Sequence, residues 1–304
     1  MSRDTGSDEL VVYIDGDFYP ESEAKVSVFD HVVLYGDAVY DTCCAWAGQI
    51  FKLDEHVDRL FESAHALKLA VPLPKVQLRE VVIETVRRNA LQNAYIKIIA
   101  TRGVGPLPLL SPYDCKPSLI VFARPYVSLV GGEAQAEGVR IKVASWRKIP
   151  DECLPSQAKT CNYLNHVLMR MEANEAGYDD ALELGIDGYV AEAPGYNVFA
   201  VKRGAIRTPA NDILKGITRQ TVLELAAGEG IPVAEESLTV FDFYNADEAF
   251  FSSTAGGIFA VSEIDGRVIG AGRPGPITTL IRHRYYDLLE SGEQSTPVYG
   301  SADA

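Results

Sequence analysis

The stretch ALELGIDGYVAEAPGYNVFAVKRGAIRT, residues 181–208, predicts two consecutive β-hairpins in the second half of the chain. The first turns at Asp187-Gly188, a pair that is typical of a type I′ turn. The second turns about Gly204, again between two runs of apolar and β-branched residues. We therefore expect the following paired strands: residues 181–186 with 189–193, and residues 198–202 with 205–208.

Helices and strands alternate on both sides of these hairpins. Apolar side chains recur at helical spacing from Val57 to Leu67, which predicts a helix capped by Asp54 and ended by Pro72 and Pro74. This mixture of elements indicates an α/β (α+β) fold. Further helices are expected at residues 76–88, 163–174, 218 to 228 or 230, and 276–289, and further strands at residues 11–15, 50–51, 94–101, 118–123, 139–146, 249–252 and 258–264.

Length and periodicity predict two domains. The chain has 304 residues, roughly two domains of about 150 residues each. The segment 126–138, which contains Gly131-Gly132, shows no sustained periodicity and is the expected linker. We expect a small N-terminal α/β domain over residues 1–125, a larger C-terminal domain over residues 139–290, and a flexible tail over residues 291–304.

Composition limits the partners and the compartment. Lys and Arg number 28 and Asp and Glu number 42, for a net charge of −14, which disfavours nucleic acid and anionic membranes as partners. We expect no membrane segment, because no apolar run reaches about 18 residues. The N-terminal residues show no signal peptide, and the five cysteines form no CxxC, so we expect a cytoplasmic protein with reduced thiols.

Several catalytic templates are missing. The sequence has no GxSxG, so a nucleophile elbow is not indicated. Gly103-Val-Gly105 leads into Pro106 and not into a helix, which argues against a dinucleotide fingerprint. The five histidines form no HExxH and no paired spacing, so no metal site is expected.

Two segments place single charged residues beside turns. PSQAKTCNYLN, residues 155–165, puts Lys159 between a proline-led loop and a helix. GYVAEAPGYNVF, residues 188–199, puts Glu192 at a strand end next to a Pro-Gly turn. Taken alone, either residue is explained equally well by an ordinary solvated charge.

Two further segments suit a phosphate. LKGITRQTV, residues 214–222, leads from Gly216 directly into a helix, whose first N–H groups and dipole favour an anion. FFSSTAGGI, residues 250–258, places hydroxyl and glycine residues after a buried strand. Arg59 on the predicted first helix can add a charged fork. An ordinary helix start, an ordinary turn and a surface arginine account for the same residues one at a time.

In combination the motifs resemble a known family. Together with VSVFDHVVLYGDAVYD (residues 26–41), FKLDEHVDRLFESA (51–64) and GRPGPIT (272–278), the four segments resemble class IV, branched-chain-aminotransferase-like pyridoxal phosphate enzymes. The resemblance covers nearly the whole chain. It implies fold type IV, with a smaller N-terminal and a larger C-terminal α/β domain, pyridoxal 5′-phosphate between them, and a homodimer or larger assembly.

The resemblance also implies roles for individual residues. Lys159 matches the lysine that forms the internal Schiff base and moves the proton during transamination. Glu192 matches the carboxylate that pairs with the pyridine nitrogen, and Tyr163 the tyrosine that hydrogen-bonds O3′ of the cofactor. The remaining implied cofactor residues are Arg59, Gly216, Ile217, Thr218 and Thr254 around the phosphate and Leu214 against the ring.

The implied reaction is ping-pong amino transfer between an amino donor and a 2-oxo acid. Lys97 stands where branched-chain enzymes usually have arginine, and Tyr40-Asp41-Thr42 stands where they usually have Phe-Glu-Gly. YDTCCAWAGQIFKLDEH, residues 40–56, also resembles (R)-selective amine transaminases. The candidate substrate residues are Tyr35, Tyr40, Tyr95, Lys97, Arg102 and Ala255.

Branched-chain or other hydrophobic amino acids are the leading substrates. A D-amino-acid or (R)-selective amine transaminase is the alternative on the same chemistry. Elimination of the aminodeoxychorismate-lyase type is less favoured, because the GVGPLPLL loop, residues 103–110, suits hydrophobic substrates. A non-catalytic interaction protein on this fold is also less favoured, because packing does not require Lys159, Tyr163 and Glu192 together.

Overall fold

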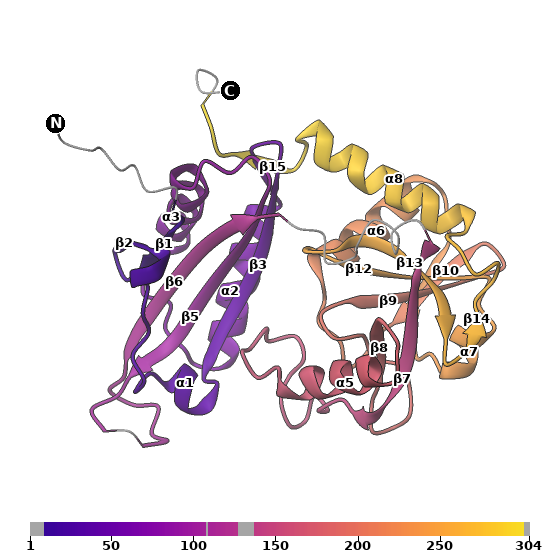
Figure 1. Ribbon diagram of the computed structural model, residues 1–304, viewed down its shortest axis with the longest axis horizontal. Coiled ribbons are helices and arrows are strands. Elements are labelled where there is room, and N and C mark those ends of the chain that lie inside the picture. The colour runs from indigo at the N-terminus through magenta and orange to yellow at the C-terminus, as the bar shows by residue number, and fades with distance from the viewer. Residues whose placement is uncertain (1–8, 108, 127–136, 301–304) are drawn as a thin grey trace. The chain divides into compact units, whose positions relative to one another are not determined.

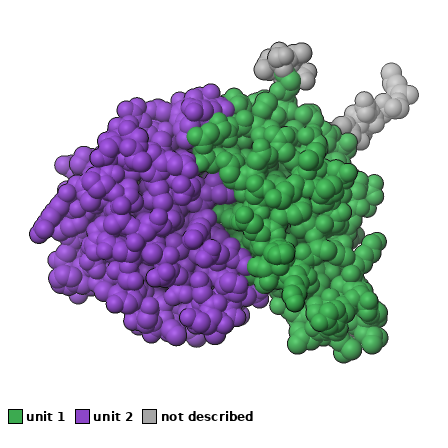
Figure 2. Space-filling view, turned by 180° about the vertical axis from the view of Figure 1, so that it is seen from behind, with its two compact units in different colours: residues 1–126, 159–161, 294–304 green, residues 127–158, 162–293 purple. Residues whose placement is uncertain are grey.

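The computed structural model describes residues 9–107, 109–126 and 137–300. The chain forms two compact units, shown in different colours in Figure 2. Unit 1 comprises Met1–Tyr126, Lys159–Cys161 and Gln294–Ala304, and unit 2 comprises Val127–Ala158 and Asn162–Glu293. Most of the predicted linker, residues 126–138, lies outside the described residues.

Unit 1 is built on an antiparallel sheet of seven strands in the order β15-β4-β3-β5-β6-β1-β2 (Figure 1). Three helices and a short 3-10 turn at Glu21–Glu23 accompany it. The strands are β1 Val11–Ile14, β2 Asp17–Pro20, β3 Ala38–Trp46, β4 Gln49–Phe51, β5 Ala94–Val104, β6 Lys116–Pro125 and β15 Ser295–Pro297, and the helices are α1 His31–Tyr35, α2 Leu53–Ala66 and α3 Lys75–Arg88.

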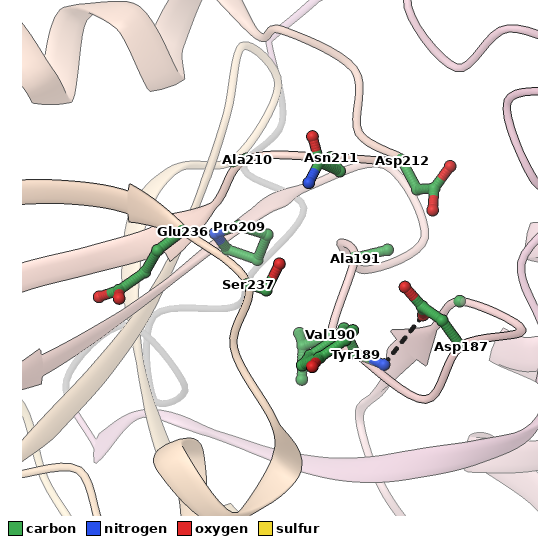
Figure 3. Close-up of a pocket in the computed structure, with 11 residues that line it drawn as sticks. Asp187, Tyr189, Val190, Ala191, Pro209, Ala210, Asn211, Asp212, Glu236 and Ser237 are labelled. Atoms are coloured by element: carbon green, nitrogen blue, oxygen red, sulfur yellow. Dashed lines mark hydrogen bonds between the residues drawn. The ribbon is translucent and has the colours of Figure 1, made fainter.

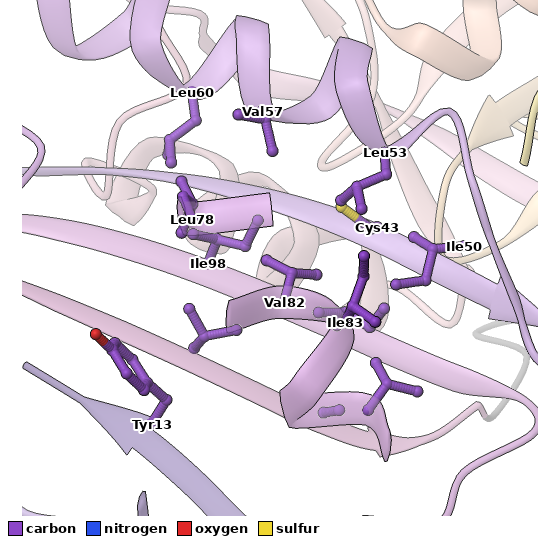
Figure 4. Packing of buried hydrophobic residues seen from close by; sticks show 14 of the residues in the cluster. Tyr13, Cys43, Ile50, Leu53, Val57, Leu60, Leu78, Val82, Ile83 and Ile98 are labelled. Atoms are coloured by element: carbon purple, nitrogen blue, oxygen red, sulfur yellow. The ribbon is translucent and has the colours of Figure 1, made fainter. Parts of the chain in front are cut away.

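The core of unit 1 lies between this sheet and helices α2 and α3 (Figure 4). Leu60 from α2, Leu78 from α3 and Ile98 from β5 have no exposed surface. Burial of each such side chain contributes about 1.5–3 kcal/mol. The amphipathic spacing that predicted both helices therefore reflects their packing on one face of the sheet.

The structure corrects two predictions in unit 1. Asp54 does not cap α2, because the N-cap is Lys52 in a left-handed conformation, and Asp54 instead accepts a hydrogen bond from Arg79. The C-terminal residues were predicted as a flexible tail, but β15 pairs with β4 and Val298 is only 1% exposed. The tail sequence has too few apolar residues to signal its place in a core.

Unit 2 contains a second sheet in the order β11-β10-β9-β12-β13-β7-β8, with β14 added to β13. No helix of the described residues is long and apolar enough to cross a membrane. The strands are β7 Val139–Arg147, β8 Asp180–Leu184, β9 Asn197–Lys202, β10 Ala205–Pro209, β11 Val233–Glu236, β12 Glu248–Ser253, β13 Gly257–Ile264 and β14 Arg267–Val268, and the helices are α5 Leu164–Glu175, α6 Ile217–Gly228, α7 Val240–Tyr244 and α8 Pro276–Ser291.

The first of the two predicted hairpins is confirmed in part. The returning segment runs antiparallel to β8, with the bridge Leu184↔Val190 and the Gly185 N–H donating to the carbonyl of Tyr189 at 2.9 Å, but it forms no regular strand, and the ladder partner of β8 is the parallel strand β7. Gly188 has a positive φ but Asp187 does not, so the turn is not type I′. The second hairpin is confirmed, since β9 and β10 pair antiparallel across Arg203-Gly204, both with positive φ. The type I′ chemistry belongs to this second turn.

The helices of unit 2 cover different strands of its sheet. Helix α5 packs on β7 and β8, α8 packs on β12 and β13, and α6 packs on β12. The start of α8 is fixed by Glu248, whose carboxylate accepts hydrogen bonds from the N–H groups of Ile277 and Thr278 at 3.0 and 2.7 Å. A Cβ on Gly275 would lie 2.1 Å from Cδ of Glu248, which explains the glycine before this helix.

Candidate active site

The segment Lys159–Cys161 lies beside β3 and extends the pairing of this strand. The Tyr40 N–H donates to the carbonyl of Lys159 and the Cys161 N–H donates to that of Ala38, both at 2.9 Å. Thr160 forms an antiparallel bridge with Val39 between them. The backbone of Lys159 is therefore fixed by a sheet, although the residue comes from a loop.

The side chain of Lys159 lies over an aromatic ring that a second lysine shares. Its Nζ atom is 4.6 Å from the centre of the Tyr40 ring, and Nζ of Lys97 is 4.1 Å from the same centre. Burial lowers the pKa of Lys97, and the nearby charge of Lys159 lowers it further against the opposing effect of Cys161. Two amines therefore lie close to the same aromatic ring.

Strand register explains why several predicted substrate residues meet. Thr42 lies opposite Lys97 and Cys44 opposite Tyr95, so the side chains of Tyr40, Lys97 and Tyr95 project from one face of the sheet. The other face packs against α2 and α3. The face of the sheet that points away from α2 and α3 therefore carries aromatic and cationic side chains.

Arg102 and Tyr35 have other contacts. The Arg102 guanidinium donates to Asp37 at 2.5 Å and to the carbonyls of Leu67 and Lys68 at 3.0 Å. The ring of Tyr35 packs edge-on against His31, with 5.1 Å between the ring centres. The three nitrogens of Arg102 thus tie together three segments of unit 1.

A buried charged cluster holds Arg59. Two of its donor nitrogens, Nε and Nη2, bind Asp41 at 2.8 Å, and His56 Nδ1 lies 2.6 Å from the same carboxylate. Burial alone would raise the pKa of Asp41, but the charge of Arg59 outweighs it and holds this pKa well below its usual range. Burial lowers the pKa of His56, so neutral His56 donates to Asp41 and Arg59 supplies the balancing charge. The sequence analysis missed Asp41 and His56 as site residues.

Glu192 is held by two donors in unit 2. Nζ of Lys148 lies 2.8 Å from Oε1 of Glu192, and the Leu214 N–H donates to Oε2 at 3.0 Å. Lys148 also donates to Ser156 and to the carbonyl of Asp212. Glu192 is 7% exposed, and the ammonium of Lys148 is the opposite charge beside it in this buried place. Lys148 directly follows Arg147 in the sequence and carried no signal of this role.

The start of α6 fits a phosphate group. As in any helix, the first-turn N–H groups of Ile217 and Thr218 have no intrahelical acceptor. The N-cap residue is Gly216, which has no side chain to accept a hydrogen bond from them. The loop before the helix is shaped by Asn197, whose amide donates to the carbonyl of Leu214 at 2.8 Å. A Cβ at Gly216 would lie 2.2 Å from Oδ1 of Asn197. Glycine at position 216 therefore allows Asn197 to lie directly beside the start of α6.

The β12–β13 turn carries Thr254 and Ala255, both partly exposed. Ser253 closes the turn by accepting the Gly256 N–H at 2.9 Å. Among the described residues, the buried hydroxyl of Ser252 has no hydrogen-bond partner, which a bound polar group would satisfy. Tyr163, the N-cap residue of α5, packs its ring against His166 with 4.6 Å between ring centres.

A separate, small pocket lies elsewhere in unit 2 (Figure 3). Asp187, Asp212 and Glu236 contribute to its wall, and Asp187 accepts the Tyr189 N–H at 3.0 Å. None of the predicted cofactor or substrate residues lines it. Its link with the site is indirect, through the Asp212 carbonyl that Lys148 binds.

The chain is similar to aminotransferases over nearly all of its length. The profile of the family described as amino-transferase class IV matches residues 38–264. A putative branched-chain-amino-acid aminotransferase of Methanocaldococcus jannaschii is 45% identical over 282 residues, 92% of this chain and 96% of that protein. The solved structure of the Escherichia coli branched-chain amino acid aminotransferase matches with a TM-score of 0.92 and 31% identity, over 96% of this chain and 100% of that one. The T.th. branched-chain amino acid aminotransferase with pyridoxamine 5′-phosphate matches with a TM-score of 0.91 and 35% identity, over 96% and 99%.

Proposed function

Because this chain belongs to the class IV aminotransferase family, we propose that it transfers the amino group of a branched-chain or similar hydrophobic amino acid to a 2-oxo acid. The proposed cofactor is pyridoxal 5′-phosphate, used in a ping-pong cycle in which both substrates share one pocket. The observation that carries the proposal is the 45% identity to the putative branched-chain enzyme across 92% of the chain. The pyridoxamine 5′-phosphate in a similar structure supports the cofactor.

The surface around Tyr40 supports this substrate class. Tyr40 and Tyr95 offer apolar walls on one face of the sheet, and Lys97 offers a cation beside them. Lys97 is the better anchor for a substrate carboxylate, because the Arg102 guanidinium is already bound by Asp37 and two carbonyls. Tyr35 and Ala255 remain proposed substrate contacts.

Each cofactor residue has a proposed task that its surroundings support. Pyridoxal 5′-phosphate, when bound, supplies an electron-accepting ring for the substrate carbon that loses a proton. Nζ of Lys159 accepts and returns that proton, while Glu192 holds the proton on the ring nitrogen. Arg59 and the N–H groups at the start of α6 bind the phosphate. The other proposed cofactor contacts are Tyr163, Leu214, Gly216, Ile217, Thr218 and Thr254.

We also propose that the chain acts as a homodimer or larger assembly in the cytoplasm. Val28, Phe29 and Val33 of unit 1 are 57–65% exposed, and exposed apolar side chains of this kind favour contact with a second copy. Size-exclusion chromatography with light scattering tests the proposed assembly.

The substrate proposal is tested on the purified, cofactor-loaded enzyme by its visible absorbance. L-leucine and L-valine are expected to shift the band of the bound cofactor, and 2-oxoglutarate to restore it. A shift with D-alanine or (R)-1-phenylethylamine, and none with L-leucine, would replace the proposed donor class by the alternative one. An absorbance band that no donor shifts would refute the transaminase proposal.

Lys159→Ala is expected to abolish turnover while leaving the fold intact. Removal of the amine that moves the proton costs about a hundredfold to ten-thousandfold in rate. Circular dichroism checks the fold, and borohydride reduction followed by peptide mass spectrometry is expected to place a pyridoxyl label on Lys159 of the wild type. Lys25→Ala, at an exposed lysine, is the control and should leave rate and label unchanged. A label on another lysine contradicts the assignment.

A further inference from the structure

Four charged or titratable side chains form one cluster in unit 2. Lys148 and Glu192 are an ion pair at 2.8 Å, and His166 Nδ1 lies 2.6 Å from Oε1 of Glu183. Polar atoms of His166, Glu183 and Glu192 all lie within 4.8 Å of one another. The proposed function gives a role to Glu192 but none to the His166–Glu183 pair.

The backbone places Glu183 next to Glu192. The Glu183 N–H donates to the carbonyl of Glu192, and the Ala191 N–H donates to the carbonyl of Glu183, each at 2.9 Å. Leu182 and Leu184 belong to the core cluster of unit 2, so Glu183 projects from the opposite face of β8, toward α5. His166 lies in the first turn of α5 and meets it there. Glu183 has no exposed surface, and packing alone would place an apolar side chain at such a position.

The surroundings of the His166–Glu183 pair favour the retention of one shared proton. Burial alone would lower the pKa of His166, but the hydrogen bond and charge of Glu183 raise it above its ordinary value. Burial raises the pKa of Glu183. Three further groups face this histidine: Glu192, the ammonium of Lys148 and the ring of Tyr163. With its proton the pair is neutral overall, and without it the pair carries a negative charge close to Glu192.

We propose that His166 is a positioning residue whose proton, shared with Glu183, keeps Glu192 anionic and able to hold the proton on the ring nitrogen of the bound cofactor. The proposal rests on the proposed function, because it takes Glu192 as the partner of that nitrogen. Loss of the shared proton brings a negative charge beside Glu192, which then takes up a proton more readily. The ring nitrogen would lose its ionised partner and the cofactor its strength as an electron acceptor.

A divalent cation is the competing occupant of the same cluster. A histidine and two carboxylates are ligands that zinc accepts. The ammonium of Lys148 opposes it, because this charge already binds the Glu192 carboxylate that a metal would need. Within the described part of the chain, the buried Oε2 of Glu183 has no hydrogen-bond partner, so the zinc measurement below decides between a cation and a proton pair.

The test uses cofactor-loaded wild type and the variants His166→Gln, Glu183→Gln and Glu192→Gln. His283→Gln, which changes an exposed histidine of α8, is the control. Nuclear magnetic resonance of histidine-labelled enzyme follows the protonation of His166 with pH. The midpoint is expected above that of His283, and Glu183→Gln should lower it by about one pH unit or more.

Kinetics and absorbance connect the pair with the cofactor. His166→Gln is expected to lower kcat roughly tenfold, because it leaves the charge of Glu183 uncompensated beside Glu192, and tenfold corresponds to about one unit of pKa. Glu183→Gln leaves no negative charge there and should lower kcat less. KM for the amino donor should change less than about twofold, because neither side chain is a proposed substrate contact. Wild-type kcat should fall as His166 loses its proton, and His166→Gln should remove this limb of the pH profile. The pH dependence of the cofactor absorbance should change in the same variants.

The outcomes separate this inference from the proposed function. A His166 midpoint equal to that of His283, or unchanged kcat and absorbance in His166→Gln, overturns the inference while leaving the transaminase assignment standing. Unchanged rate and absorbance in Glu192→Gln overturn the assigned partner of the ring nitrogen. Stoichiometric zinc retained by the wild type after dialysis and lost in His166→Gln would show a metal site in place of a proton pair.

Discussion

Asp41 is a carboxylate with no solvent exposure, on the strand that also carries Tyr40. It binds Arg59 through two hydrogen bonds and His56 through a third. Asp41 therefore fixes the orientation of Arg59, the arginine that is proposed to bind the cofactor phosphate. Removal of this carboxylate changes the orientation of Arg59 and takes away the charge that balances it.

Asp41→Asn is expected to lower the free energy of unfolding by roughly 3–5 kcal/mol, the cost of removing one member of a buried ion pair. It should also weaken binding of the cofactor. Denaturant unfolding and fluorescence titration measure the two effects. Asp54→Asn removes an exposed carboxylate that also pairs with an arginine, and it should cost no more than about 1 kcal/mol. Equal costs for the two variants would contradict the role of Asp41.

Acid should destabilise the protein through the same cluster. The pKa values of Asp41 and His56 both lie below their ordinary values in the folded protein. Each group therefore stabilises the fold above its unfolded pKa, about 3.9 and 6.5, and this contribution is lost as pH falls. Unfolding free energy measured from pH 7 to about 4 should decline, and the decline should be shallower in His56→Gln. A parallel decline in both proteins would exclude His56 as a contributor.

The sequence predicted the site residues that stand in distinctive local motifs and missed those that act through space. Lys159 and Glu192 are predicted from the resemblance of their segments to a known family, and their roles remain proposals. Lys148, Glu183 and Asp41 act on residues far away in the chain. No spacing rule connects them, since pairing of strands and packing of helices bring them together.

At the level of elements, helix α6 combines two glycines in opposite environments. A Cβ on Gly216, at its start, would lie 2.2 Å from the side chain of Asn197, whereas a Cβ on Gly228, at its end, meets no atom within 4 Å. The first glycine shapes the proposed phosphate cradle. The second has no such contact and lowers the helical propensity of the last turn.

Gly216→Ala is expected to destabilise the fold by about 1–3 kcal/mol through overpacking and to weaken cofactor binding. Gly228→Ala is the matched control and should stabilise the protein by up to about 1 kcal/mol. Thermal unfolding and the cofactor dissociation constant measure both variants. If Gly216→Ala binds the cofactor as tightly as the wild type, the start of α6 does not hold the phosphate.

Element prediction succeeded where periodicity was strong and failed where burial removed it. The α/β class and its assignment to fold type IV are confirmed by the two mixed units and the similar solved structures. Helices α2 and α3 follow directly from their apolar stripes. Strand β3 escaped notice because eight of its nine residues are buried on both faces, so it shows no alternation. The first hairpin is only partly regular, since its returning segment makes an isolated antiparallel bridge, and the ladder partner of β8 is β7, which local sequence does not reveal.

Considered across the whole molecule, unit 1 combines segments that lie far apart in the sequence. β15 pairs with β4, the Arg87 guanidinium donates to the carbonyl of Val298, and the Tyr299 hydroxyl donates to that of Leu91. Residues 294–300 therefore complete a core that residues 9–126 begin. The stability of unit 1 therefore depends on residues 294–300, although unit 2 lies between these residues and residues 9–126 in the sequence.

Val298→Ala should lower the stability of unit 1 by about 2 kcal/mol, from lost burial and the cavity left behind. The chain has two tryptophans, Trp46 in unit 1 and Trp146 in unit 2, so Trp146→Phe and Trp46→Phe backgrounds report the units separately. The Trp46 signal should shift to lower denaturant more than the Trp146 signal. Val76→Ala, at a side chain that is 73% exposed, should change either signal by less than about 0.5 kcal/mol. Equal shifts of both signals would contradict a local role.

The three residues Lys159–Cys161 belong to unit 1, whereas the residues directly before and after them belong to unit 2. The proposed reactive amine consequently has the rigidity of a β-ladder, whereas residues 150–157 lie outside that ladder. A library randomised over residues 152–155 and 157, with Asp151 and Ser156 kept because Ser156 donates its N–H to Asp151 and accepts a hydrogen bond from Lys148, should retain the amine in register. Altering β3 at Ala38 or Tyr40 would instead move the amine's own support.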